Sequence, residues 1–334
     1  MPRRLTALVL ALGLLLAAAA LAAGTSSARP HRAAGANLTL VAYSTPREAY
    51  AKLIPEFQKT AAGRDVDFEQ SYGGSGEQAR AVVSGLRADI VALSLEPDIT
   101  TLVKAKIVAP GWKNDRFKGI VSRSVVVFAV RRGNPKKIRD WEDLVKPGVQ
   151  VVTPNVQTSG GAKWNIVAAY GAMRRKKKTQ AQTVAYLRNL YRHIVSQDRS
   201  AREALQTFLA GRGDVLLAYE NEAIFANKRG QDVPYVIPKA TVRIENPIAV
   251  TRTTRNAKAA RAFVSFLRTA RAQRTFAENG YRPVLPSASR GFSFPVRPQL
   301  FTVKWLGGWA KVDKQLFDAR SGIVTKIQRE RGRS

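Results

Sequence analysis

Residues 152–165 read VTPNVQTSGGAKWN, and this stretch is the clearest guide to the fold. The apolar residues 149–152 predict a short buried strand, which the following proline and asparagine end. Ser159 has the position of an N-cap for an apolar helix over residues 160–173. That helix begins with two glycines, although each glycine costs a helix about 1 kcal/mol relative to alanine.

The glycines indicate a function for this helix start. Without side chains, Gly160 and Gly161 let a ligand approach their backbone N–H groups closely. The first N–H groups of a helix have no intrahelical partner, and the helix dipole adds about half a positive charge there. The stretch therefore predicts an oxyanion site at a helix N-terminus.

Two further segments show the same order of strand, small polar loop and helix start. They are residues 73–76, which read GGSG, and residues 199–202, which read RSAR. One such loop is usually only a turn and a cap. Three converging helix N-termini, however, hold a dehydrated dianion with neutral donors, since each charge-assisted hydrogen bond contributes about 1.5 to 3 kcal/mol.

Several ordered strings along the chain carry a resemblance to a known family. They are RGNPK at 132–136, DWEDLVKPG at 140–148, TPN at 153–155, TSGGAKWN at 158–165, YGGSG at 72–76, GDVLLAYENE at 213–222, YRP at 281–283 and GGWA at 307–310. In this set and order, the chain resembles the sulfate-binding proteins that feed bacterial ABC importers. The resemblance covers nearly everything after the N-terminal leader.

The resemblance implies a two-lobed α/β fold of the periplasmic-binding-protein type (type II), with the ligand cleft between the lobes. The first lobe would be discontinuous, with residues 38–123 and 248–334, and the second would hold residues 124–247. Such a protein would capture sulfate, present it to the membrane permease of an ABC importer, perform no chemistry and need no cofactor.

The family's ligand-binding positions fall on particular residues here. Ser75, Ser159, Gly160 and Gly161 match directly, and a backbone N–H falls on Ala201, or on Ser200 if the alignment slips by one. The family usually places a tryptophan indole where Tyr219 stands, and an aspartate where Ser44 stands. A phenol donates a hydrogen bond as an indole does, but with a different reach. Arg202 and Ser44 are expected to support the site from behind.

Strands and helices alternate along the chain, which is typical of a parallel α/β sheet. The hydrophobic pattern predicts strands at 38–42, 66–71, 89–93, 124–130 and 214–219, and helices at 48–60, 76–86, 182–191, 201–210 and 257–279.

Composition excludes several kinds of site. The chain has no cysteine, which rules out thiolate catalysis, disulfides, cysteine metal sites and a lipoprotein anchor. Its two histidines, His31 and His193, are too few for a histidine-based triad or zinc centre. Ser75 and Ser159 lie in no G-x-S-x-G elbow, so we expect no nucleophilic catalysis.

The N-terminus has the form of a secretory signal. Two arginines precede an apolar run that ends in alanines, so residues 1–23 are expected to be a cleaved signal peptide. Residues 24–37 are small and polar and predict a disordered linker. The mature protein is expected in the periplasm or cell-wall zone, as a monomer without a lipid anchor.

Two alternatives stay open at this stage. The first is another tetrahedral oxyanion, namely thiosulfate, phosphate or molybdate. Hydrogenphosphate carries a proton and requires an acceptor, for which Glu77 is the candidate. The second is a basic extracellular protein that binds anionic polymer, because 55 Lys and Arg against 24 Asp and Glu give a net charge of +31. The basic run 174–178 has no interleaved aromatic residues, so we expect a solvated loop and no nucleic-acid binding.

Overall fold

The computed structural model describes residues 35–295 and 299–332. The predicted signal peptide 1–23 lies outside this range, as does the linker up to residue 34. The chain begins as an alternation of strands and helices: β1 (Ala36–Tyr43), α2 (Arg47–Gln58), β2 (Val66–Gly73), α3 (Ser75–Val83), β3 (Ile90–Ala92) and α4 (Glu96–Lys104). The three strands are parallel in the order β2, β1, β3, as the sequence pattern predicts.

Both faces of β1 and β3 are buried, because helices cover each face, whereas the edge strand β2 is largely accessible to solvent. Alternate residues of β1 point to opposite sides: Leu38 and Leu40 join one hydrophobic cluster with α2 and the later α9 (Ala257–Phe266), whereas Val41 joins another with α3 and α4. Continuous apolar strands of this kind are typical of parallel sheets.

A second group of parallel strands follows in the middle of the chain. Its elements are η1 (Trp141–Val145), β5 (Val151–Pro154), α5 (Gly160–Arg175), α6 (Gln180–His193), β6 (Ile194–Asp198), α7 (Ala201–Leu209), β7 (Val215–Tyr219), α8 (Glu220–Lys228) and β8 (Tyr235–Val236). β5 lies between β6 and β7 and is parallel to both. The helix predicted from residue 160 is confirmed with its start at Gly160.

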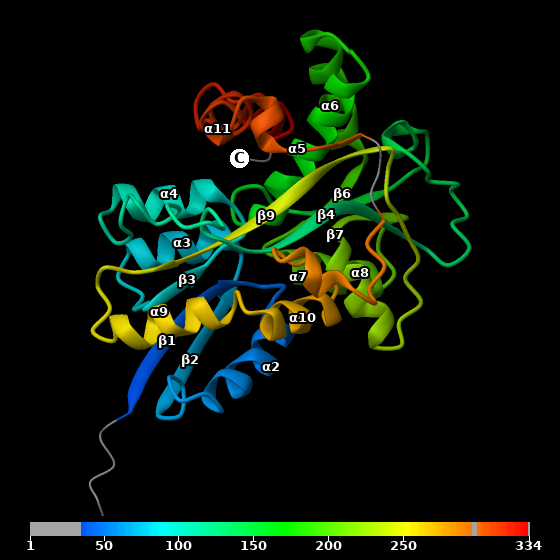
Figure 1. Cartoon of the computed structure of the whole chain (residues 1–334). Coiled ribbons are helices and arrows are strands. Elements are labelled where there is room, and N and C mark those ends of the chain that lie inside the picture. Colours follow the sequence, from blue (N-terminus) through cyan, green and yellow to red (C-terminus); the bar gives the residue numbers. More distant parts are fainter. Residues whose placement is uncertain (1–34, 296–298, 333–334) are drawn as a thin grey trace, which may run out of the picture. The chain divides into compact units, whose positions relative to one another are not determined.

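Two long antiparallel strands, β4 (Ile120–Val130) and β9 (Ala240–Val250), connect the two groups (Figure 1). The first half of β4, from Ile120 to Val125, pairs with the central part of β9, from Arg243 to Pro247. Beyond this shared part, β9 pairs with β3 at Ile248, and β4 pairs with β7 from Val126. The chain therefore passes between the strand groups twice, at adjacent places in one continuous sheet.

The C-terminal part contains α9 (Ala257–Phe266), α10 (Ala270–Glu278), η2 (Pro286–Ser289), β10 (Gln299–Phe301), η3 (Val303–Leu306), α11 (Trp309–Phe317) and α12 (Ile323–Glu330). Helices α9 and α10 pack against the first strand group, in the cluster that contains α2. Phe301, Leu316 and Ile327 instead belong to the cluster that contains α5. The aromatic ring of Trp309 lies 4.8 Å from that of Trp164, in an edge-to-face arrangement.

The prediction of one helix over residues 257–279 was wrong, because the structure divides it at residues 267–269. Thr269 caps α10 by accepting a hydrogen bond from the Ala272 N–H. The Gln273 amide donates to the Leu267 carbonyl and to the Val121 carbonyl of β4, so a contact with a distant strand stabilises the break. Sequence periodicity does not report such a contact.

The basic run 174–178 is less of a free loop than expected. Arg174 and Arg175 complete α5, and Lys176 forms ion pairs with Asp140 and Glu142. Arg175 lies over the Trp305 ring, 4.2 Å from its centroid. Across the ranges 35–295 and 299–332, no helix combines the length and apolarity needed to cross a bilayer.

Candidate anion-binding site

The three predicted loops meet at one edge of the sheet, where parallel strands from both groups end. Loop 155–159 contacts both of the others: the Thr158 carbonyl accepts from the Glu77 N–H at 3.1 Å, and the Thr158 hydroxyl donates to the Arg199 carbonyl at 2.7 Å. A Cβ atom on Gly74 would lie 2.6 Å from the Thr158 oxygen and 2.8 Å from the Arg199 oxygen. Only glycine fits where the loops approach so closely.

Ser159, Gly160 and Gly161 form the buried start of α5. Ser159 has the N-cap backbone conformation, but its side chain makes no capping hydrogen bond with any residue that the structure describes. The sequence predicted a capped helix, whereas these first N–H groups keep their donor capacity. A Cβ atom on Gly161 would lie 3.3 Å from both the Ala201 Cβ and the Ser159 Oγ, and 3.7 Å from the Tyr219 ring. Five predicted site residues therefore lie together.

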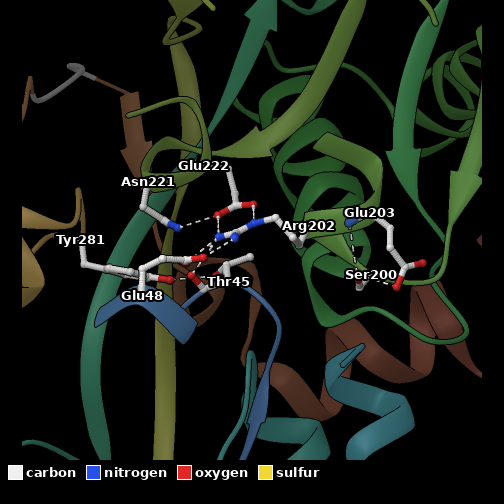
Figure 2. Close-up of polar contacts among 8 residues, drawn as sticks. All are labelled: Thr45, Glu48, Ser200, Arg202, Glu203, Asn221, Glu222 and Tyr281. Carbon is white, nitrogen blue, oxygen red and sulfur yellow. Dashed lines mark hydrogen bonds and ion pairs between the residues drawn. The ribbon is translucent and has the colours of Figure 1, made fainter. Parts of the chain in front are cut away.

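The start of α7 distinguishes Ala201 from Ser200. The Ser200 hydroxyl accepts from the Glu203 N–H at 3.2 Å and donates to the Glu203 carboxylate at 3.1 Å (Figure 2). The Ser200 hydroxyl therefore uses its hydrogen bonds to cap the helix. Ala201 faces Gly161 and has no polar side-chain group. The geometry favours the Ala201 N–H over Ser200 as the donor from this loop.

Ser75, a predicted ligand-binding residue, lies at the start of α3 and uses its hydroxyl in contacts within the protein. The side chain is buried; its Oγ donates to the Asp98 carboxylate and accepts from the Ser94 N–H at 2.8 Å. Burial raises the pKa of Asp98, although the nearby Lys163 charge and the Ser75 hydrogen bond act against this rise. For a ligand, α3 retains the N–H groups of Ser75 and Gly76, because the Glu77 N–H donates to the Thr158 carbonyl.

Tyr219 ends β7 with its ring buried, and its hydroxyl lies 2.5 Å from the Ser94 Oγ, where either group is able to donate. Burial raises the pKa of Tyr219 well above its ordinary value, so the phenol stays neutral and keeps its proton. The centroid of the Tyr43 ring lies 6.4 Å from that of the Tyr219 ring. The Tyr43 hydroxyl has no hydrogen-bond partner among the residues that the structure describes. Two phenols thus lie at the ends of β1 and β7.

Ser94 was missed by the sequence analysis. It follows β3 and precedes α4, so it repeats the order of strand, small polar residue and helix start seen in the three loops that were recognised. Its carbonyl accepts from the Trp164 indole at 2.8 Å and from the Asn246 amide at 3.1 Å. Ser94 therefore links β3 to α5, β9 and Tyr219.

Arg202 joins elements of both strand groups behind the Ala201 helix start. Figure 2 shows its guanidinium between the carboxylates of Glu48 on α2 and Glu222 on α8, with N–O distances of 2.7 to 3.0 Å. It also donates to the Thr45 carbonyl, next to the half-buried Ser44. The supporting role assigned to Arg202 stays a prediction.

The three charges of this cluster perturb one another. Burial acts against the Arg202 cation, but the two carboxylates outweigh it and raise the Arg202 pKa. For Glu48, hydrogen bonds and the Arg202 charge outweigh burial and lower the pKa. Glu222 is more deeply buried, and this burial raises its pKa in spite of Arg202.

Other charged groups beside the loops already have partners. Glu77, the candidate acceptor for a protonated anion, pairs with the exposed Arg199. Lys163 pairs with Asp313 at 3.0 Å, and Arg80 donates to the Gln157 carbonyl. Within the described ranges, His, Asp and Glu side chains form no group of three or more that could hold a metal ion. The loops offer mainly neutral N–H and O–H donors, a set that suits a fully ionised oxyanion.

Comparison with known proteins places this arrangement among transport proteins. Residues 38–282 match the family described as bacterial extracellular solute-binding protein. A sulfate-binding protein of Synechococcus elongatus is 43% identical over 302 residues, which cover 87% of this chain and 86% of the relative. A thiosulfate-binding protein of Pseudomonas aeruginosa is less similar, at 33% identity over 95% of this chain and 96% of the relative.

A solved structure shows the same fold. The sulfate-binding protein SubI from Mycobacterium tuberculosis matches with a TM-score of 0.82 and 45% identity, over 85% of this chain and 100% of that chain. The predicted fold class, a two-lobed periplasmic-binding-protein fold, is confirmed by this match.

Proposed function

Since the chain belongs to the sulfate-binding proteins, within the bacterial extracellular solute-binding proteins, we propose that it captures sulfate and delivers it to an ABC-type importer. Members of this family bind a solute without transforming it, so the protein is not an enzyme. The observation that carries the proposal is the meeting of three helix starts, at Ser75, Gly160 and Ala201, beside Tyr219.

We propose that the anion is held by the N–H groups of Gly160, Gly161 and Ala201, with N–H groups of the α3 start and the hydroxyl groups of Ser159 and Tyr219. Sulfate is fully ionised at neutral pH and accepts hydrogen bonds on every oxygen. Each bond from a neutral donor to a charged acceptor contributes about 1.5 to 3 kcal/mol. No basic side chain is required, and the nearby cations are paired with protein groups.

We propose that the same arrangement couples capture to a conformational change. We propose a first lobe of residues 38–123 and 248–295, and a second of residues 124–247. The hydrophobic contacts of Phe301 and Leu316 with the α5 cluster favour placing residues 299–332 with the second lobe rather than the first. A ligand would gain donors from α3 and α5 together only when the lobes are closed.

Export completes the proposed function. The family acts outside the cytoplasm, and a cleaved signal peptide at residues 1–23 would bring the mature chain to the periplasm or cell-wall zone, without a lipid anchor. We propose that it acts there as a monomer and engages the importer's permease in the ligand-bound form.

The donor set predicts a selectivity that calorimetric titration measures. Sulfate is expected to bind more tightly than phosphate at neutral pH, because the proton of hydrogenphosphate would face another donor, at a cost of about 1 to 3 kcal/mol. Titrations of the mature chain with sulfate, thiosulfate, phosphate and molybdate decide among the alternatives. Phosphate affinity equal to that of sulfate would contradict the proposal and indicate that Glu77 leaves Arg199 to accept the proton.

Tyr219→Phe tests the departure from the family's usual tryptophan. We expect sulfate affinity to fall by about 1.5 to 3 kcal/mol, since the variant removes one donor with little change in shape. Ser94→Ala is the companion variant, because it removes the hydroxyl partner of Tyr219 but leaves the phenol able to turn toward the anion. We expect its loss of affinity to be smaller. If the phenylalanine variant binds sulfate with unchanged affinity, the Tyr219 hydroxyl does not contact the anion, and the ring only packs beside the site.

A further inference from the structure

A cavity lined by residues other than those of the three helix starts has about 730 Å³ of space. It lies between loop 113–118, the strands β4 and β9, and residues 284–285. Its lining contains five basic side chains and only two carboxylates, Glu96 and Glu245; the basic residues are Lys113, Arg116, Lys118, Arg123 and Arg243. A volume of this size accommodates a small organic or inorganic ligand.

Strand pairing brings Arg123 and Arg243 together. Arg123 of β4 is opposite Glu245 of β9, and Arg243 lies two residues before Glu245, so all three side chains share one face. One carboxylate serves both cations: Glu245 lies 2.9 Å from Arg243 and 3.9 Å from Arg123. Burial and the neighbouring Arg243 lower the pKa of Arg123, and Glu245 acts against this change.

The remaining cations leave a net positive charge in the cavity. Lys113 pairs with Glu96 at 2.5 Å. Arg116 and Lys118 are exposed and have no carboxylate partner anywhere in the part of the chain that the structure describes. The Nε atoms of Arg123 and Arg243 likewise have no hydrogen-bond partner there. An anion that contacts several of these cations at once would supply the negative charge that Arg116 and Lys118 lack.

The cavity is separate from the candidate sulfate site. Asn246, which follows Glu245, is fully buried and donates to the Ser94 carbonyl, whereas Glu245 is partly exposed on the other face of β9. The two sites also differ in chemistry. The helix starts present neutral donors to a small anion, while this cavity presents flexible cations to a larger one.

We propose that this cavity is a second anion site, which binds a chain of linked phosphates such as a triphosphate. Guanidinium groups match phosphate oxygens in pairs of hydrogen bonds, and lysines add point charges. A linear polyanion offers several phosphate groups, both to the arginines on the strands and to loop 113–118, which line the same cavity. The inference does not depend on which anion binds at the helix starts.

Titration with tripolyphosphate tests the proposal. The protein is first saturated with sulfate, so that only the second site is open, and binding is measured by calorimetry at low and high salt. We expect binding that weakens strongly as salt rises, because the cavity is open and its cations are exposed. If sulfate competes with tripolyphosphate, both ligands bind at one site, and the proposal is overturned.

Three variants make the test specific. Arg116→Gln with Lys118→Gln removes two charges without a carboxylate partner from a surface loop, and Arg123→Gln removes from β4 a charge that shares Glu245 with Arg243. The matched control, Lys177→Gln with Arg192→Gln, removes two exposed charges elsewhere. We expect tripolyphosphate affinity to fall about tenfold in the loop variant, with sulfate affinity unchanged. An equal loss in the control would show attraction by net charge alone and overturn the proposal.

A parallel titration with a nucleoside triphosphate shows whether the site prefers a free phosphate chain or one attached to a nucleoside. Equal affinity for it and for tripolyphosphate would indicate that only the phosphates are recognised. Tighter binding of the nucleoside triphosphate would indicate that the nucleoside contacts the apolar lining, which includes Phe117 and Leu285. Undetectable binding of both, at low salt, would rule out the site.

Discussion

Replacing Gly161 with valine is expected to abolish sulfate binding, with a loss of at least about 100-fold in affinity and little change in the fold. A Cβ atom at this position already lies 3.3 Å from the Ala201 Cβ and the Ser159 Oγ. The two methyl groups of valine would extend into the space between Ala201 and Tyr219, where the anion must approach the backbone. Losing even two charge-assisted hydrogen bonds accounts for an effect of this size.

Gly161→Ala is the graded control for this variant. Its Cβ atom requires its neighbours to move by only a few tenths of an ångström, so affinity should fall less than with valine. Calorimetry measures binding, and circular dichroism with thermal unfolding verifies that both variants are folded. If the valine variant binds sulfate like the wild type, the anion is held elsewhere.

Arg202→Met is expected to destabilise the protein by about 3 to 5 kcal/mol, because it leaves the carboxylates of Glu48 and Glu222 without their shared cation. Glu222 has a side chain only 1% exposed, so water cannot replace the arginine there. The loss is measured as the free energy of unfolding in denaturant. Arg199→Met is the matched control, since Arg199 is 70% exposed in its pair with Glu77 and should cost little.

The loss of unfolding free energy in the Arg202→Met variant should become smaller as the pH falls. In the wild type, the lowered pKa of Glu48 means that its stabilising effect is present above the ordinary value of 4.5 and is lost as pH falls through the folded pKa. Without Arg202, burial would raise the pKa of Glu222 further and would no longer be opposed at the partly buried Glu48, so protonation stabilises the variant. The difference in unfolding free energy should therefore be largest near pH 7 and shrink toward pH 4 to 5. A deficit that does not change with pH would indicate lost packing against Phe225 instead.

The sequence was sufficient for those features of the site that have a local cause. Glycines after a strand are conspicuous, so the start of α5 and its donors could be predicted from residues 152–165. Ser94 was overlooked because it adds one small residue between β3 and α4, without glycines to mark a close approach. Its partners, Trp164 and Tyr219, lie 70 and 125 positions away in the chain.

Long-range contacts also explain the other differences. Ser75 stays a predicted ligand-binding residue, but the sequence did not indicate that its hydroxyl donates to Asp98, 23 positions later in the chain. The break between α9 and α10 depends on the Gln273 amide, which reaches a carbonyl of β4. Such contacts follow from the packing of finished elements, which neither periodicity nor capping patterns report.

The hydrogen bond from the Trp164 indole to the Ser94 carbonyl gives the molecule an optical reporter of its own. The donor belongs to α5 and the acceptor to the loop after β3, so separation of the two strand groups would break this bond and admit water to the indole. Trp164 emission should then move to longer wavelength, and sulfate should reverse the shift. Lobe closure would become measurable in unlabelled protein, in real time and at low concentration, with Trp164→Phe, which keeps the other four tryptophans, as the reference for the Trp164 signal.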